Sequence, residues 1–237
     1  GSTNTFIGSE AGKGNSSAPH SSGVYNTFIG ANAGKVFTTG GYNTAVGYDA
    51  GVALTTGDGN VIMGTNSGTQ IDAGGSNTAI GSDAQRYNNV SEAVVIGERA
   101  GLYNSGNKNV YVGNEAGRNS GAGTECVFIG MNAGYYGTHD DSTAVGYAAG
   151  QYATGSYNTF LGHSAGKGGT TSAPYSSGTH NVALGHSALA AFTTGNDNVA
   201  IGSAAGDAIT SGYRNVTIGR YAGSAINTGV SNIILGY

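Results

Sequence analysis

The sequence is poor in several residues that most folded domains use freely. Its 237 residues include one cysteine, Cys126, two prolines, no tryptophan and only 9% charged residues. A single cysteine excludes an internal disulfide, and two prolines exclude a collagen-like chain. No apolar run reaches the ~20 residues of a membrane-spanning helix, so we expect no membrane insertion. The formal net charge of −4, with no basic run, argues against a nucleic-acid partner.

Glycine, in contrast, is abundant, with 45 residues. At this density a largely helical protein is excluded, because each glycine in a helix costs about 1 kcal/mol relative to alanine. Hydrophobic residues make up 38% of the chain and recur at regular intervals. That regularity excludes a disordered linker.

One motif recurs from end to end: asparagine, a β-branched residue, an apolar residue, an aliphatic residue and glycine, then any two residues, then alanine and glycine. It reads NTFIGSEAG from Asn4 and NTFIGANAG from Asn26. The first glycines of the fourteen copies are Gly8, Gly30, Gly47, Gly64, Gly81, Gly97, Gly113, Gly130, Gly146, Gly162, Gly185, Gly202, Gly219 and Gly236.

The copies follow one another at a nearly constant spacing, and only the spacings after Gly8 and Gly162 are longer. A period of roughly 16 to 17 residues is too short for a strand, a helix and two loops, but it suits one turn of a β-solenoid. The sequence therefore predicts an all-β parallel β-roll of 14 coils, forming one domain over 1–237 with loop insertions at 13–23 and 167–178.

Alternation of side chains along each strand predicts which residues face inward. We expect the residue after the asparagine and the aliphatic residue two positions later to line the interior. The residue between them is apolar in nearly every copy and is then outside. Because a strand that is apolar on both faces is normally buried on both, we expect other copies of the chain to cover it. The predicted seam residues are Phe6, Phe28, Ile62, Phe128 and Phe160.

The first position of the motif is asparagine in 11 of 14 copies; Ala93, Cys126 and Ser142 replace it in the others. Stacked asparagine side chains form hydrogen-bonded ladders along an array of strands. We therefore expect this column to have a structural role.

Strings such as NTAIGSDA from Asn77 resemble the head repeats of trimeric autotransporter adhesins and the repeats of phage tail-fibre proteins, and the resemblance covers essentially the whole chain. It implies a side-by-side homotrimer of left-handed β-rolls. It also implies a structural and adhesive rod of an extracellular fibre that attaches to a host or surface. The expected partners are further copies of the chain, further fibre segments and a surface glycan or host receptor, with this sequence a piece of a longer fibre.

The two insertions share a Gly-Lys-Gly start and an Ala-Pro-(His/Tyr)-Ser-Ser-Gly end. Loops that project from repeat arrays often carry recognition, so Pro19, His20, Pro174 and Tyr175 are candidate recognition residues. The alternative is a decoration duplicated along with the coils around it. Three tyrosines that precede the asparagine position are further candidates, which either stack on sugars or pack along an oligomer seam. They are Tyr25, Tyr42 and Tyr157.

The sequence contains only weak matches to catalytic and metal-binding motifs. The string from Gly162 to Gly166 matches the nucleophile elbow of esterases, but in register it is an ordinary corner of the repeat. His163 and His186 share one column, and we expect surface histidines rather than a metal pair. Asp58, Asp140 and Asp141 lack the regular array of calcium-binding β-rolls. We therefore predict no catalytic residue, metal or cofactor, and no enzymatic activity.

An alternative function is a monomeric solenoid that binds glycans or ice on a flat face. Ice binding predicts a regular row of exposed threonines. The threonines at Thr5, Thr27 and Thr44 fall in the column predicted to face inward, which counts against this alternative.

Overall fold

The computed structural model describes residues 1–14, 21–137, 140–169 and 175–237. In these ranges the protein is all-β, without helices, and every copy of the motif forms one three-residue strand. The strands are β1 (Thr5–Ile7), β2 (Thr27–Ile29), β3 (Thr44–Val46), β4 (Val61–Met63), β5 (Thr78–Ile80), β6 (Val94–Ile96), β7 (Val110–Val112), β8 (Val127–Ile129), β9 (Thr143–Val145), β10 (Thr159–Leu161), β11 (Val182–Leu184), β12 (Val199–Ile201), β13 (Val216–Ile218) and β14 (Ile233–Leu235). The chain divides into two compact units, residues 1–115 with β1–β7 and residues 116–237 with β8–β14.

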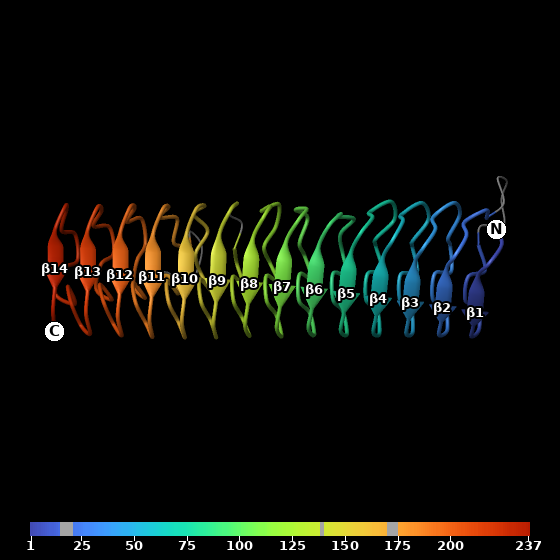
Figure 1. The fold of residues 1–237 in the computed structure, drawn as a ribbon, viewed down its shortest axis with the longest axis horizontal. Coiled ribbons are helices and arrows are strands. Elements are labelled where there is room, and N and C mark those ends of the chain that lie inside the picture. The colour runs from blue at the N-terminus through green and yellow to red at the C-terminus, as the bar shows by residue number, and fades with distance from the viewer. Residues whose placement is uncertain (15–20, 138–139, 170–174) are drawn as a thin grey trace. The chain divides into compact units, whose positions relative to one another are not determined.

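Each unit is a parallel β-solenoid, as the repeat predicts. Within a unit every strand pairs in parallel with the next (Figure 1). Equivalent motif positions pair directly, as Phe28 does with Ala45. The register is kept across both long spacings, where Ile7 pairs with Ile29 and Leu161 with Leu184. The insertions are therefore accommodated outside the strand ladder.

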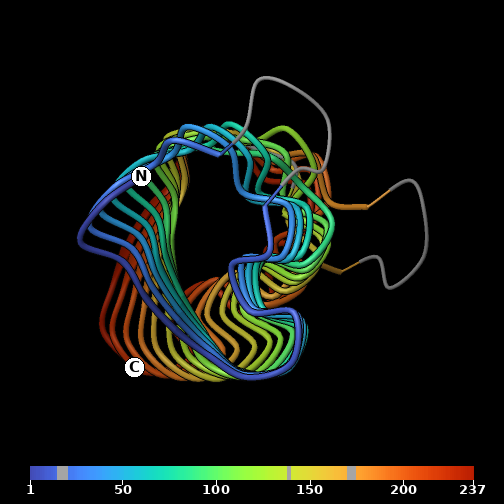
Figure 2. The same ribbon diagram turned by 90° about the vertical axis from the view of Figure 1, so that its right-hand side faces the viewer.

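Glycine turns each strand into the next corner. Viewed along the stack, successive coils of each unit follow nearly the same path (Figure 2). At the first motif glycine this brings backbones very close, because a Cβ at Gly47 would lie 2.6 Å from the carbonyl oxygen of Gly64. Gly47 also has φ of +138°, a region that side chains disfavour. Both constraints explain why this position is glycine in every copy.

The predicted direction of the strand side chains is wrong. The middle residue of each strand points into the coil, and Phe28, Ile62 and Phe128 are fully buried there, with Phe160 2% exposed. Phe6, in the first coil, belongs to the same column and is 37% exposed, and its ring stacks on that of Phe28 at 5.2 Å between centroids. These five residues line the interior of single chains, so they do not form a seam between chains.

The first and third residues of each strand point outward and are partly exposed, for example Ile129 (38%) and Leu184 (41%). The physical reason is the width of the coil. A turn of such a short period encloses room for one side chain per strand, and the side of the strand with two side chains faces out. Since both sides are apolar, the pattern of polarity did not reveal which side was inside.

The middle residue of the strand and the residue at the second motif glycine position share one volume inside the coil. A Cβ at Gly166 would lie 2.2 Å from the ring of Phe160. A coil with phenylalanine in the middle of its strand therefore needs glycine at this position. In the next coil the strand carries the small Ala183, and the position equivalent to Gly166 holds the buried Leu189. The two coils thus fill the same space in opposite ways, as close packing of interiors requires.

The asparagine ladder is confirmed. The Asn43 side chain accepts a hydrogen bond from the backbone N–H of Asn60 at 2.9 Å, and its Nδ2 donates to the Gly57 carbonyl at 2.8 Å and to Asn26 Oδ1 at 3.1 Å. All three asparagines are 0–1% exposed. The same pattern links Asn181 to Asn198 in the second unit. The ladder satisfies backbone groups that face the interior, where water is absent.

Replacing Phe160 by alanine should cost about 3–5 kcal/mol of the free energy of unfolding, because it leaves a cavity. Gly166→Leu alone should cost about 1–3 kcal/mol through overpacking. The double variant reproduces the pair Ala183 and Leu189, so its loss should be smaller than the sum of the single losses by about 1 kcal/mol or more. Urea denaturation of the four proteins measures this coupling. Strictly additive losses would contradict the shared interior volume.

Asn43→Ala should destabilise the chain by roughly 3 kcal/mol or more, because several buried partners lose their hydrogen bonds at once. Asn114→Ala is the matched control, since Asn114 is exposed and makes one hydrogen bond at 3.3 Å to Glu98. It should change stability by less than about 0.5 kcal/mol. Thermal and urea unfolding measure the stability of both variants. Equal losses would show that the asparagine ladder contributes no more to stability than an exposed asparagine does.

Candidate binding surface

The outward side of the strands forms a regular surface on each unit. We call it the outer sheet face, and it consists of the first and third residues of every strand. The first position holds threonine, valine or isoleucine, and the third holds isoleucine, valine, leucine or methionine. No position of this face carries a charge. Its most exposed members away from the chain ends include Leu161 (46%), Leu184 (41%) and Met63 (40%).

The outer sheet face runs over seven strands in each unit, with neighbouring strands about 4.8 Å apart. Monomeric soluble proteins rarely expose contiguous apolar patches larger than a few hundred Å². An uncharged face of aliphatic residues and threonine is therefore suited to burial against another protein surface. We predicted that these residues line the interior of the coil, whereas the structure places them on its outer side.

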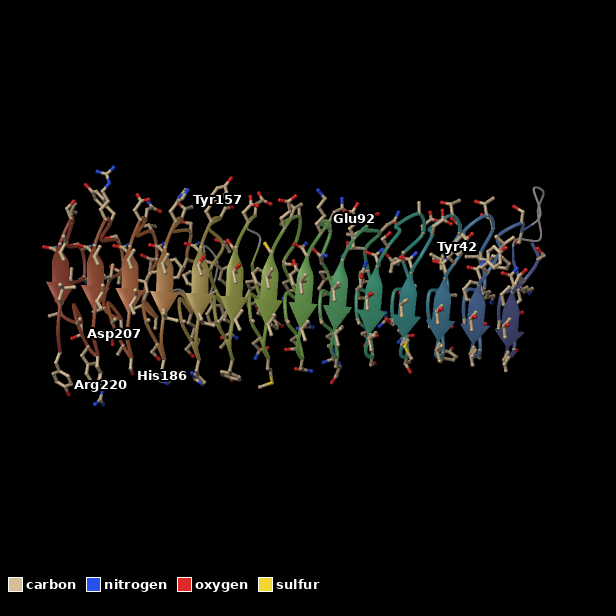
Figure 3. The ribbon with its side chains drawn as sticks, viewed as in Figure 1. Tyr42, Glu92, Tyr157, His186, Asp207 and Arg220 are labelled. Atoms are coloured by element: carbon tan, nitrogen blue, oxygen red, sulfur yellow. The ribbon has the colours of Figure 1, made fainter. Side chains whose placement is uncertain are left out.

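Aromatic side chains border this face where the strands begin. Tyr25 and Tyr42 stack with ring centroids 5.0 Å apart, and Tyr157 stacks on His180 at 4.9 Å. Figure 3 shows Tyr42 and Tyr157 at this edge of their units. All three tyrosines are more than half exposed. Their position fits either of the predicted roles, sugar stacking or packing along a seam, and the choice between them stays a prediction.

The other edge, where the strands end, carries a second row of rings. Tyr147 stacks on His163 at 4.9 Å, and His163 stacks on His186 at 5.0 Å. Figure 3 shows His186 and Arg220 on this side. The shared column of the two histidines, predicted from the repeat, therefore brings their rings together despite the insertion between them.

Among the candidate residues of the insertions, Pro19, His20 and Pro174 lie outside the described residues. Tyr175 is described and half-buried. Its ring stacks on that of Tyr136 at 4.5 Å, and the next residue, Ser176, exchanges backbone hydrogen bonds with Tyr152 at 3.0 Å and Thr154 at 2.7 Å. These contacts give Tyr175 a packing role at the end of the insertion. A role in recognition stays a prediction.

The residues of the weak catalytic and metal-binding motifs occupy ordinary positions of the solenoid. Ser164 lies in a solenoid corner with φ of +56°, and Glu10 has +58° at the equivalent position. The carboxylates of Asp58 and Asp140 accept hydrogen bonds from the backbone N–H groups of Gly41 (2.6 Å) and Thr124 (2.9 Å) in the preceding coil. Across the described ranges, no three or more histidine, cysteine, aspartate or glutamate side chains are grouped so as to hold a metal ion.

Cys126 occupies the asparagine position of the coil that contains β8. It is 1% exposed, and its Sγ lies 3.4 Å from the carbonyl oxygen of Thr124. Burial raises the pKa of the Cys126 thiol to about 11. The thiol is therefore protonated at neutral pH and is a poor nucleophile or metal ligand.

The chain matches no protein-family model and no curated protein sequence. Nor does the described part of the chain contain a helix that is long and apolar enough to cross a membrane.

The raised pKa of Cys126 gives a pH-dependent prediction. At pH 8 only about one thiol in a thousand is ionised if the pKa is about 11, so the folded protein should react very slowly with a disulfide reagent such as Ellman's. The rate should rise as the pH approaches 11, and chain unfolded in urea should react at once. Rapid reaction of the folded protein at pH 8 would contradict the buried position of Cys126.

Proposed function

We propose that the chain is a structural and adhesive segment of a homotrimeric extracellular fibre, of a phage-like tail or a bacterial surface, and that it has no enzymatic role. The observation that supports this proposal is the outer sheet face. It is uncharged over all seven strands of each unit, and an unbroken column of aliphatic residues runs beside a column of threonine, valine and isoleucine. A surface of this kind is stable in water when another protein surface covers it.

A further copy of the same chain is the partner that suits this face best. Its strands repeat with the same spacing, so equivalent residues can meet on every coil. Since the face has no charges, identical copies do not repel one another across it. Association around a closed symmetry axis would bury the face on every copy and leave none exposed. The number of copies, three, and the left-handed sense of the coils rest on the resemblance to adhesin and tail-fibre repeats.

In such a fibre the exposed corners and edges would carry attachment. Every surface residue is present three times around the axis, so weak individual contacts to a surface glycan or host receptor add up through multivalency. The tyrosines at the edges, Tyr25, Tyr42 and Tyr157, and the two insertions are the parts that would meet such a partner.

A second function is favoured by one observation. The threonine column, predicted to face inward, faces outward at Thr27, Thr44 and Thr78, which are partly exposed. A monomeric chain could use this face to bind ice or glycans. Valine interrupts the column at Val61 and Val94, so the row is less regular than ice binding favours. The mass in solution separates the two functions, and a thermal hysteresis measurement on a monomer tests the second.

The trimer predicts a mass in solution of three times the chain mass of 23.4 kDa. Leu184→Asp should shift the protein to the monomer while leaving its circular dichroism unchanged. The reason is that the seam would have to bury three like charges that have no partners. Light scattering coupled to size exclusion measures the mass.

Thr194→Asp introduces the same charge at an exposed position outside the outer sheet face and is the matched control. It should keep the parental mass. A parent that is monomeric at micromolar concentration would overturn the trimer, and a trimeric Leu184→Asp variant would remove the outer sheet face from the interface.

A further inference from the structure

Two histidines stand side by side where β10 and β11 end. His163 follows Gly162, and His186 follows Gly185, the equivalent glycine of the next copy of the motif. Because Leu161 pairs with Leu184 in the parallel ladder, both histidines occupy the same place on neighbouring coils. Their ring centroids are 5.0 Å apart, and their planes differ by 17°.

The backbone holds this arrangement on both sides of His186. The N–H of Gly185 donates to the Leu161 carbonyl at 2.9 Å, and the N–H of Ser187 donates to the His163 carbonyl at 2.9 Å. Both side chains are exposed. Among the described residues, neither imidazole has a hydrogen-bond partner, so the nitrogens of both rings are accessible from solvent.

The sequence favoured two separate surface histidines over a metal pair, but the contact between the two rings supports the other alternative. We propose that His163 and His186 together bind one late first-row divalent metal ion, of the class of Zn²⁺, Ni²⁺ or Cu²⁺. Neutral imidazole is the nitrogen ligand that these ions prefer in proteins. Zinc–nitrogen bonds of about 2.0–2.1 Å in tetrahedral geometry place the two nitrogens roughly 3.3 Å apart. The ring centroids are 5.0 Å apart in the stacked arrangement, so metal binding requires the two side chains to rotate until one nitrogen of each ring points at the ion. Water completes the coordination.

His180 gives a contrast within the same two coils. It precedes Asn181 at the opposite edge of the outer sheet face and stacks on Tyr157 at 4.9 Å. Its Nδ1 lies 3.1 Å from Thr179 Oγ1. His180 is exposed like the pair but has no described histidine beside it. It therefore offers a single monodentate ligand, and its replacement is a matched control.

The competing explanation for the pair is ring stacking alone. Tyr147, in the same column, stacks on His163 and continues the row. The variant His186→Tyr separates the two explanations, because it keeps an aromatic ring at this position and removes the second nitrogen ligand.

The experiment is a titration of the full chain with Zn²⁺ at pH 7.5, followed by calorimetry on protein made without a histidine tag. The parent should bind one ion per chain, and its melting temperature should rise with zinc, because ligand binding stabilises the folded state. His163→Ala and His186→Tyr should each weaken binding by roughly tenfold to a hundredfold, since the two ligands no longer act at one effective concentration. His180→Ala should bind like the parent.

Absence of zinc binding by the parent overturns the proposal. It is also overturned if His186→Tyr binds as the parent does, or if His180→Ala loses as much affinity as the variants of the pair. Circular dichroism confirms that each variant is folded. Both ligands come from one chain, so the result does not depend on the number of copies in the assembly.

Discussion

The width of the coil interior is the constraint on which the rest of the structure depends. Each turn of the chain is so short that its interior holds one side chain from each strand, the corner alanine and one larger apolar side chain from the rest of the coil, such as Leu54 or Phe192. This is why a phenylalanine such as Phe160 requires a glycine at Gly166, and why Leu189 is accepted beside Ala183. The asparagine ladder follows from the same constraint. A short side chain that donates and accepts can satisfy the inner backbone groups without taking space from the core.

The narrow interior also determines what appears on the surface. Each strand has three apolar or β-branched residues, but only the middle one fits inside. The other two have no place except the outer sheet face. The apolar surface of this chain is thus a direct consequence of its fold, and the proposed self-association follows from it. Charges are confined to corners and edges, where ion pairs such as Lys35 with Glu10 (2.6 Å) and Arg86 with Asp83 (2.9 Å) lie.

Much of this architecture could be predicted from the sequence. The spacing of the motif glycines indicated the solenoid and its register, and the asparagine column indicated the ladder. Which face of each strand lies inside the coil could not be predicted in the same way. The alternation of side chains reveals the inner face only when the two faces differ in polarity. A more specific signal was present. The two copies with a large residue in place of the second motif glycine, Gln85 and Leu189, both have alanine in the middle of their strands, Ala79 and Ala183. Such compensation identifies neighbours in a core.

The side-chain rows were only partly predictable. A shared column placed His163 near His186, because the repeat fixes which residues are adjacent on neighbouring coils. The contact between Tyr175 and Tyr136 was not predictable, since Tyr175 belongs to an insertion that has no place in the repeat. Columns predict contacts between regular positions, whereas a residue of an insertion has no equivalent on the neighbouring coils.

The way in which the insertions leave the strand ladder undisturbed has a consequence for evolution. After the strands β1 and β10 the chain lengthens by about a third of a coil, yet the next strand pairs in the same register. The register of the strand ladder therefore does not depend on the length of the loop at this corner. A change in the size or sequence of this loop can alter what the chain meets outside while the paired strands beneath keep their positions.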